Sequence, residues 1–155
     1  VAYSCSKNFA LYRERVGALF VVGQRQGVDL AASNLTALAR ANYSMPPDHG
    51  AAVVRTILDS DELSAIWRAE LDAMRARVGE LRAALAREGR IGPVDLDRLA
   101  TQHGFFASLE LAPAEIVRLR EDHGVYVVPS GRINIAGLRE DQVGSFAAAL
   151  RAVLA

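Results

Sequence analysis

The sequence has 155 residues, the length of one ordinary domain. Hydrophobic residues make up 51% and charged residues 23%, and the 18 acidic residues equal the 18 basic ones, which excludes the strongly basic surface typical of a nucleic-acid-binding protein. No apolar run is long enough to span a bilayer, and the single cysteine, Cys5, excludes an intramolecular disulfide and fits a reducing compartment.

The chain opens inside an expected strand. Residues 1–6 resemble the end of a strand, and residues 17–23 form a short apolar run bounded by glycines, as a buried strand does. Because the sequence also starts with Val1 rather than Met, we expect it to be a piece of a longer protein, which leaves room for a targeting signal upstream.

Two helices are expected next. Asp29 is placed to cap a helix that runs to about Tyr43, and Asp48 to cap a second helix that ends near Leu58. Between them the sequence SMPPDHG ends the first helix, because paired prolines and a glycine cannot continue it. The apolar positions of the first helix are Leu30, Leu35 and Leu38.

The longest periodic segment is residues 60–87. Apolar residues recur there at spacings of three and four, while arginine and glutamate occupy the other faces, which predicts one long amphipathic helix. The pattern favours a helix packed on a sheet over a coiled coil, because it covers only about three heptads. The apolar positions are Leu63, Trp67, Leu71, Met74, Val78, Leu81 and Leu85.

The remaining residues alternate between helix-like and strand-like segments. Pro113 begins a helix that ends at Gly124, and a closing helix runs from about Glu140 to Leu154. Such alternation around a mixed sheet predicts an α/β or α+β layer architecture. A loop with a short helix is expected at residues 89–104, and strands are expected at residues 105–111, 125–128 and 132–137.

Only one of the 18 basic residues, Lys7, is a lysine; the other 17 are arginines. Arginine stays charged, whereas lysine can lose its proton and its free amine can form a Schiff base. The lone lysine is therefore a candidate reactive group, with an ordinary surface residue as the alternative. The histidines are widely spaced and each precedes a glycine, which gives no metal-binding pattern and predicts loop positions for His49, His103 and His123.

Three motifs, in order along the chain, give Lys7 a context: SCSKNFALYRERVG from Ser4, RANYSMPPDHGAAVV from Arg40 and SGRINIAGL from Ser130. Together they resemble the pyridoxal-phosphate enzymes of fold type I, in the class I family of aspartate and aromatic amino acid aminotransferases. The resemblance extends over nearly the whole chain and implies the C-terminal portion of such an enzyme, from the cofactor lysine onward.

The resemblance also implies an α/β architecture. Residues 1–58 would be the end of the large cofactor-binding domain, residues 59–90 a long bridging helix, and residues 91–155 the small C-terminal domain. In the family, the small domain closes on the substrate and excludes water from it.

The cofactor implied by the resemblance is pyridoxal 5'-phosphate, bound through the first motif. Lys7 is implied to form a Schiff base with the cofactor aldehyde, which requires a primary amine that arginine lacks. After the substrate displaces it, the Lys7 amine is implied to move a proton at the substrate α-carbon, as general base and then general acid. Arg15 and Ser4 are implied to bind the cofactor phosphate, the arginine through paired charge-assisted hydrogen bonds.

The resemblance assigns the substrate to other residues. Arg132 is implied to hold the substrate α-carboxylate, a bidentate contact that orients the amino acid for reaction. Asn134, two residues further along the same strand face, is implied to support the site through hydrogen bonds. Phe106 is implied to line the substrate pocket, with an ordinary core phenylalanine as the alternative.

At Arg40 the resemblance implies both the class of substrate and a homodimer partner. In the family that the chain resembles, this arginine crosses a homodimer interface and meets the side-chain carboxylate of aspartate, glutamate or their oxo acids in the neighbouring site. A buried cation without a partner is costly, so dicarboxylates fit well. Three departures from the family pattern stand out: Met45 replaces a polar residue near this pocket, which favours an aromatic or broad substrate range, Ala10 replaces a common glycine, and Cys5 replaces a common tyrosine or alanine.

The function implied is amino-group transfer between aspartate or aromatic L-amino acids and 2-oxoglutarate, in the cytoplasm and without a nucleic-acid or membrane partner. The family residues that contact the cofactor ring lie upstream of the lysine, outside these 155 residues, so we expect the isolated chain to be inactive. Two alternatives stay open. One is β-elimination or decarboxylation with the same cofactor and fold, and the other is a non-catalytic interaction or dimerisation fragment.

Overall fold

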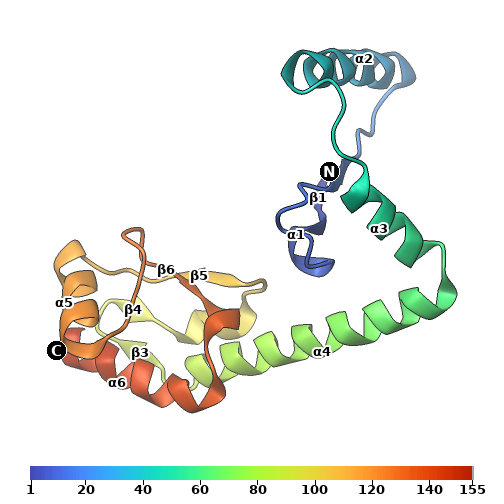
Figure 1. The fold of residues 1–155 in the computed structure, drawn as a ribbon. Coiled ribbons are helices and arrows are strands. Elements are labelled where there is room, and N and C mark those ends of the chain that lie inside the picture. Colours follow the sequence, from blue (N-terminus) through green and yellow to red (C-terminus); the bar gives the residue numbers. More distant parts are fainter. Residues whose placement is uncertain (155) are drawn as a thin grey trace. The chain divides into compact units, whose positions relative to one another are not determined.

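A computed structural model describes residues 1–154 of the protein. The chain divides into two units, Val1–Leu71 and Asp72–Ala155, and the division falls within the long helix α4 (Asp61–Ala86; Figure 1). The predicted long helix is therefore confirmed, and it contributes residues to both units. Among the described residues, no helix combines the length and the apolar character needed to cross a membrane.

The first unit begins with a short antiparallel hairpin. β1 (Ala2–Ser4) pairs with β2 (Gly17–Leu19) in a register that sets the last residue of β1 opposite the first residue of β2. A single helical turn, α1 (Cys5–Asn8), follows β1 directly, and the amide of Cys5 donates a hydrogen bond to the carbonyl of Val16 (3.0 Å). The hairpin therefore brings the residues just after β1 next to those just before β2.

Two further helices follow in the first unit, α2 (Arg25–Asn42) and α3 (His49–Leu58). The SMPPDHG break separates them as predicted. The prediction that Asp29 caps α2 is wrong, because the helix begins one turn earlier and Asp29 lies inside it, where its carboxylate is 3.9 Å from the guanidinium of Arg25. Asp48 precedes α3 as predicted, although its side chain makes no capping hydrogen bond.

The apolar side chains of β2 and α2 are more exposed than expected. β2 covers only three residues, and Leu19 and the following Val22 are 56% and 93% exposed. The prediction of a buried strand at residues 17–23 is wrong. Within residues 1–154, β2 pairs with β1 alone, and its side chains are uncovered. Helix α2 likewise has no buried residue.

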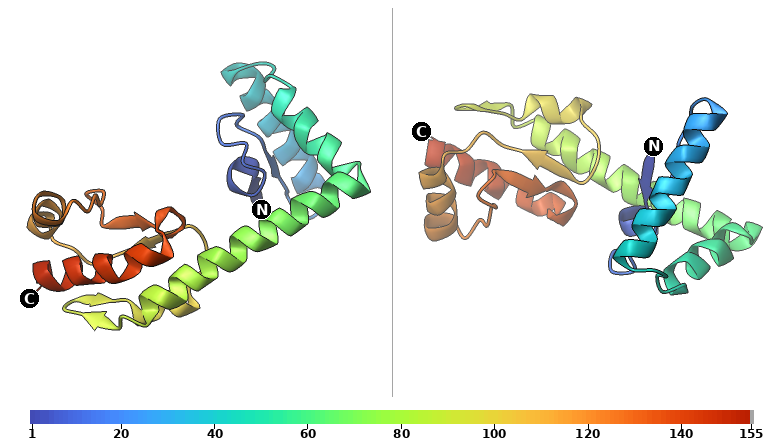
Figure 2. Two further views of the ribbon diagram at one scale, coloured as in Figure 1. Left: turned by 60° about the horizontal axis from the view of Figure 1, so that its bottom comes forward. Right: turned by 90° about the horizontal axis from the view of Figure 1, so that it is seen from above.

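The second unit holds the main hydrophobic core. The last turns of α4 pack there with α5 (Pro113–His123) and α6 (Val143–Leu154), and α5 contacts α6 near the C-terminal end of α6 (Figure 2). Of the periodic apolar residues of α4, Leu81 and Leu85 belong to this core. Gly124 ends α5 in the left-handed conformation, as predicted.

The strands of the second unit form two separate antiparallel pairs. β3 (Arg90–Ile91) pairs with β4 (Val94–Asp95), where only a loop and a short helix were expected, and β5 (Phe106–Ser108) pairs with β6 (Arg132–Asn134). The prediction of a mixed sheet is therefore wrong for residues 1–154, whose strands pair only in antiparallel twos. Short 3₁₀ helices occupy Asp97–Thr101, Ile135–Gly137 and Glu140–Gln142.

The predicted strand at residues 125–128 is also absent from the structure. The segment alternates as a strand does, because Val125 and Val127 pack against the core while Tyr126 is 82% exposed. It belongs to no strand pair among the described residues. An alternating pattern predicts which side chains face inward, but a strand also needs a hydrogen-bonding neighbour.

Gly131 sets the turn that leads into β6. Its φ of 72° lies in the left-handed region, and the amide of Leu109 donates a hydrogen bond to its carbonyl (3.0 Å). A Cβ at Gly131 would overlap the carbonyl oxygen of Leu109. Only glycine therefore combines this backbone conformation with this close approach of the two strands.

We predict that Gly131→Ala destabilises the protein more than Gly89→Ala. Both glycines have a positive φ (72° and 71°), but nothing lies within 4 Å of a Cβ built at Gly89. Each alanine therefore adds backbone strain of about 1–2 kcal/mol, and only Gly131→Ala adds a steric clash. Urea unfolding followed by circular dichroism measures both, and equal losses in the free energy of unfolding would contradict this account.

Candidate functional site

Lys7 lies in the single turn of α1, with an exposed side chain. Its Nζ atom lies 3.9 Å from the centroid of the Tyr12 ring, a cation–π contact of a kind worth about 0.5–1 kcal/mol at an exposed site. Sequence reasoning missed Tyr12 as a neighbour of the lysine, although the aromatic residue was visible in the same motif. The contact is made because the chain turns back between the two residues.

The hairpin brings Ser4 and Arg15 to the same end of the strand pair. Ser4 is the residue of β1 opposite Gly17, and its Oγ accepts a hydrogen bond from the Ser6 amide (3.2 Å). Arg15 lies just before the end of the loop, and its Nη1 donates to the carbonyl of Tyr12 (3.1 Å). A guanidinium has five N–H donors, so this single bond leaves capacity to bind an anion.

The loop between α1 and β2 contains two residues in an uncommon backbone conformation. Ala10 and Arg15 each have a φ of 55°, which costs a residue with a side chain about 1–2 kcal/mol. Glycine adopts this conformation without strain, which explains physically why a glycine suits the position that Ala10 occupies. At Arg15 the strain is maintained by the packing around the loop.

Helix α3 packs against the part of the loop that carries Arg15. The Nδ1 atom of His49 lies 3.1 Å from a carboxylate oxygen of Glu14, and Gly50 is the buried residue of α3. A Cβ at Gly50 would overlap Cγ2 of Val16 and lie 2.7 Å from Cβ of Glu14. The backbone of α3 therefore approaches this loop as closely as a glycine allows.

The loop positions predicted for the histidines are confirmed only for His103. His49 is the first residue of α3 and His123 the last residue of α5. Within residues 1–154, no group of three or more histidine, cysteine, aspartate or glutamate side chains is arranged to hold a metal ion.

Trp67 of α4 supports the turn that carries Lys7. Its indole N–H donates a hydrogen bond to the carbonyl of Asn8 (2.7 Å), and its ring stacks on Phe9 with 4.4 Å between the centroids and 12° between the planes. The Asn8 side chain also donates to the hydroxyl of Tyr3 in β1. Sequence periodicity identified Trp67 only as an apolar helix position, since nothing in the pattern indicates a bond to a segment so distant in the sequence.

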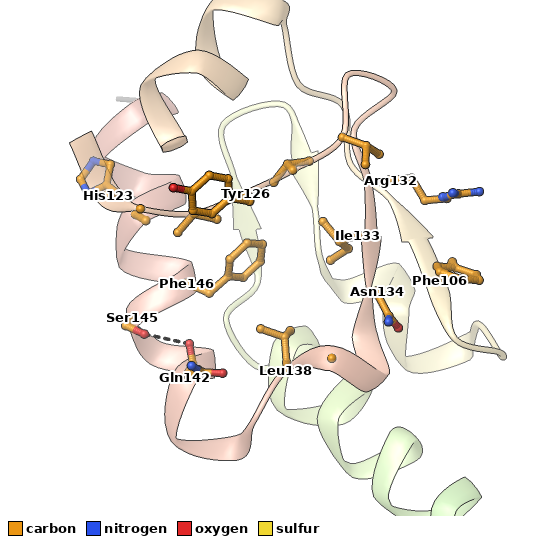
Figure 3. Close-up of a pocket in the computed structure, with 16 residues that line it drawn as sticks. Phe106, His123, Tyr126, Arg132, Ile133, Asn134, Leu138, Gln142, Ser145 and Phe146 are labelled. Atoms are coloured by element: carbon orange, nitrogen blue, oxygen red, sulfur yellow. Dashed lines mark hydrogen bonds between the residues drawn. The ribbon is translucent and has the colours of Figure 1, made fainter. Parts of the chain in front are cut away.

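A second group of predicted residues lies on one face of the β5–β6 pair. Phe106 is directly opposite Asn134, and the guanidinium carbon of Arg132 lies 4.9 Å from the centroid of the Phe106 ring. All three side chains are exposed, whereas Ile133 between them is buried. Figure 3 shows Arg132 and Phe106 on the side of β6 that faces away from Ile133.

A pocket of about 720 Å³ borders this strand pair. It lies between β6, the segment that follows α5, and α6, and it combines apolar and polar lining groups (Figure 3). Its volume falls in the range of small-molecule sites. The lining residues include Arg132, Asn134, Tyr126, Gln142, Ser145 and Phe146.

Arg40 belongs to neither group. It lies in the last turn of α2 with an exposed side chain, and no side-chain hydrogen bond or ion pair joins it to another residue among 1–154. The structure thus gathers Ser4, Lys7 and Arg15 in one hairpin. It gathers Phe106, Arg132 and Asn134 on one strand pair.

Comparison with known proteins assigns the chain to a family. Residues 1–150 match the family model described as aminotransferase class I and II. The chain belongs to this aminotransferase family. A tyrosine aminotransferase of Rhizobium meliloti (strain 1021) is 52% identical over 148 residues, which cover 95% of this chain and 38% of the relative. An aspartate aminotransferase of Escherichia coli (strain K12) is 45% identical over 157 residues, which cover 99% of this chain and 40% of the relative.

Solved aminotransferases have the same fold over the matching region. The crystal structure of an aromatic-amino-acid aminotransferase from Burkholderia pseudomallei, covalently bound to pyridoxal phosphate, matches with a TM-score of 0.85 and 38% identity, over 100% of this chain and 40% of that chain. A mitochondrial aspartate aminotransferase from Trypanosoma brucei matches with a TM-score of 0.82 and 32% identity, over 99% of this chain and 41% of that chain. The family and the fold-type I class predicted from the three motifs are confirmed. The chain spans about two fifths of the length of these aminotransferases.

We predict that Trp67 controls the stability of the turn that carries Lys7. Trp67→Phe keeps the ring contact but leaves the Asn8 carbonyl without its donor, at a cost of about 1 kcal/mol, or roughly fivefold in exchange protection. Trp67→Leu also removes the stacking and costs more. Hydrogen exchange at the amides of Phe9 and Leu11, which both bond to the Cys5 carbonyl (3.3 Å each), measures the effect.

Ile66→Ala provides the matched control for this prediction. Ile66 precedes Trp67 on the same helix and is 52% exposed, so its truncation is expected to leave exchange in the turn unchanged. Exchange at residues 5–11 that is the same in Trp67→Leu as in the wild type would show that the tryptophan does not hold this turn.

Proposed function

We propose that the protein is part of a pyridoxal-phosphate-dependent aminotransferase that moves an amino group between aspartate or aromatic L-amino acids and 2-oxoglutarate. The observation that carries this proposal is the hairpin of β1, α1 and β2, which gathers the only lysine of a class I and II aminotransferase chain with Ser4 and Arg15. Relatives named for tyrosine, aspartate and aromatic amino acids support the substrate range.

The chemistry of the hairpin residues fits pyridoxal phosphate. The cofactor carries an aldehyde and a phosphate. The exposed primary amine of Lys7 suits the first, and the hydroxyl of Ser4 and the guanidinium of Arg15 suit the second. A similar solved aminotransferase carries the cofactor covalently bound, which supports its assignment here. When bound, the cofactor supplies an electron sink for the substrate α-carbon.

The side chains of this chain then have three tasks. Lys7 would hold the cofactor through its aldehyde, and its amine, once released, would act as the base that takes a proton from the substrate α-carbon and then as the acid that returns it. Arg132 holds the substrate α-carboxylate through two parallel hydrogen bonds, which fixes the orientation of the α-carbon. Phe106 lies against the Arg132 guanidinium and limits the positions it can take, and Asn134 adds a polar group on the same strand face.

The proposal extends to a homodimer in which Arg40 serves the neighbouring subunit. Its guanidinium would pair there with the side-chain carboxylate of a dicarboxylic substrate. Its exposure near the end of a helix without buried residues supports a position at an interface. The partners are then small amino acids, oxo acids and a second copy of the protein, in the cytoplasm, a compartment that the single cysteine, Cys5, fits.

The domain organisation belongs to the same proposal. Residues 1–58 complete the large domain, residues 59–90 form the bridging helix, and residues 91–155 form the small domain. Because the chain spans about two fifths of its relatives, the activity is assigned to the whole protein. Residues 1–155 alone are expected not to catalyse transamination.

We predict that borohydride treatment of the complete protein loaded with pyridoxal phosphate attaches the cofactor irreversibly to Lys7. Mass spectrometry of the peptide that contains residue 7 detects the added mass. Lys7→Arg keeps a cation at this position but has no primary amine, so it is expected to prevent the modification and to lower transamination by a factor of at least about 10²–10⁴.

The products decide between this proposal and other chemistry on the same fold. Aspartate or an aromatic donor with 2-oxoglutarate is expected to yield glutamate and the matching oxo acid. Release of ammonia would indicate elimination, and release of carbon dioxide would indicate decarboxylation, in place of transamination. A peptide that is unmodified at Lys7 would rule out the lysine as the cofactor anchor.

We predict that Gly50→Ala weakens the binding of pyridoxal phosphate by roughly tenfold, which is the effect of losing about 1.4 kcal/mol from the phosphate contact. The added methyl group would push against Glu14 and Val16 and displace Arg15 between them. Gly79→Ala is the matched control, since Gly79 is also helical and nothing lies within 4 Å of a Cβ built there. Absorbance titration with the cofactor gives both dissociation constants, and equal values would contradict a role for α3 in placing Arg15.

A further inference from the structure

Arg82 of α4 is buried in the second unit, with only 3% of its surface exposed. Its Nε donates to the carbonyl of Gly104 (3.2 Å). Its Nη2 donates to the carbonyls of His103 (3.3 Å), Gly104 (2.8 Å) and Phe106 (2.8 Å). All of these acceptors are backbone oxygens of one short segment, residues 103–106, which leads into β5.

Burying the Arg82 guanidinium in this core carries a desolvation cost that no ion pair within the described residues offsets. No carboxylate among residues 1–154 forms an ion pair with Arg82, and its Nη1 is buried without a hydrogen-bond partner among those residues. Burial without a neighbouring anion lowers the pKa of the Arg82 guanidinium. Apolar residues of similar volume commonly stabilise a core as well as a buried charge does, so the benefit of this arginine lies in the geometry that it imposes.

The segment that Arg82 holds carries Phe106. The carbonyl of Phe106 is one of the three carbonyls that accept hydrogen bonds from Arg82, and the Phe106 ring lies 4.9 Å from the guanidinium carbon of Arg132. Gly104 has a φ of 91°, and nothing lies within 4 Å of a Cβ built there. Its own packing therefore places few limits on the backbone conformation of the segment. The planar fork of Arg82, which binds several carbonyls at once, supplies those limits.

We infer that Arg82 is a positioning residue for substrate binding: from inside the core, its guanidinium fixes residues 103–106 so that Phe106 supports Arg132 in the orientation that receives a substrate carboxylate. The inference rests on the proposed function. Arg82 touches neither the substrate nor the cofactor in this role, and it acts through Phe106.

The test compares Arg82→Met and Arg82→Lys in the complete aminotransferase. Arg82→Met removes all four hydrogen bonds. We expect the KM for the amino-acid substrate to rise roughly tenfold or more, while kcat changes less than about threefold. The reason is that the carboxylate contact is made in both the ground state and the transition state. Arg82→Lys keeps the charge and some donors but not the planar fork, so an intermediate KM is expected. The dissociation constant of pyridoxal phosphate should stay unchanged, because Lys7, Ser4 and Arg15 lie in the other unit.

Two control variants separate positioning from general loss of stability. Leu85→Ala loosens the same core from the same helix, where Leu85 is completely buried. Arg118→Met removes another guanidinium that donates to backbone carbonyls, those of Ala152 and Val153 (3.1 and 3.0 Å) in α6. Both are expected to lower the thermal midpoint and to leave the KM unchanged.

Each outcome decides the inference. A wild-type KM in Arg82→Met, or equal increases in Arg82→Met and Leu85→Ala, would overturn it. If Arg82→Met does not fold, Arg82→Lys decides, and a wild-type KM in that variant overturns the inference. A wild-type protein that neither binds pyridoxal phosphate nor transfers amino groups would instead contradict the proposed function, and the inference with it.

Discussion

The antiparallel pairing of β1 with β2, extended by the hydrogen bond from the Cys5 amide to the Val16 carbonyl, is the constraint on which the lysine site depends. Without this pairing, Ser4 and Arg15 would be the two ends of an unordered segment with Lys7 between them. With it, Ser4 and Arg15 lie at one end of a hairpin, and Lys7 occupies the turn between them. Tyr12 contributes its ring to Lys7 and its carbonyl to Arg15, so it links these two cations within the same loop.

The residues proposed to bind the substrate are placed by strand pairing in the second unit. In the β5–β6 pair, alternation sends Ile133 into the core and leaves Phe106, Arg132 and Asn134 together on the opposite face. The core therefore determines which face of the pair carries these three exposed side chains. The close approach at Gly131 and the buried fork of Arg82 then hold the two strands and the segment that precedes them.

Helix α4 has a different role at its two ends. Near its start, Trp67 contacts the residues that follow the lysine, and near its end Arg82 contacts the residues that lead into β5. Both contacts run from a side chain to backbone carbonyls, so they fix the path of the chain rather than a particular side chain. Such contacts are compatible with many sequences in the segments that they hold, which is why those segments give little local indication of them.

The sequence by itself determined the family, through three motifs that contain Lys7, Arg40 and Arg132, and it determined the long helix, the SMPPDHG break and the helix ended by Gly124. These features depend on local periodicity, capping and residue chemistry. Only the tertiary structure decided that residues 125–128 form no strand, that α2 begins before Asp29, and that Trp67, Gly50 and Arg82 contact the segments that carry the candidate site residues. The physical reason is that strand pairing and contacts between distant backbones depend on which segments meet in space, and a local pattern records a residue's preference but not the neighbour that it will find.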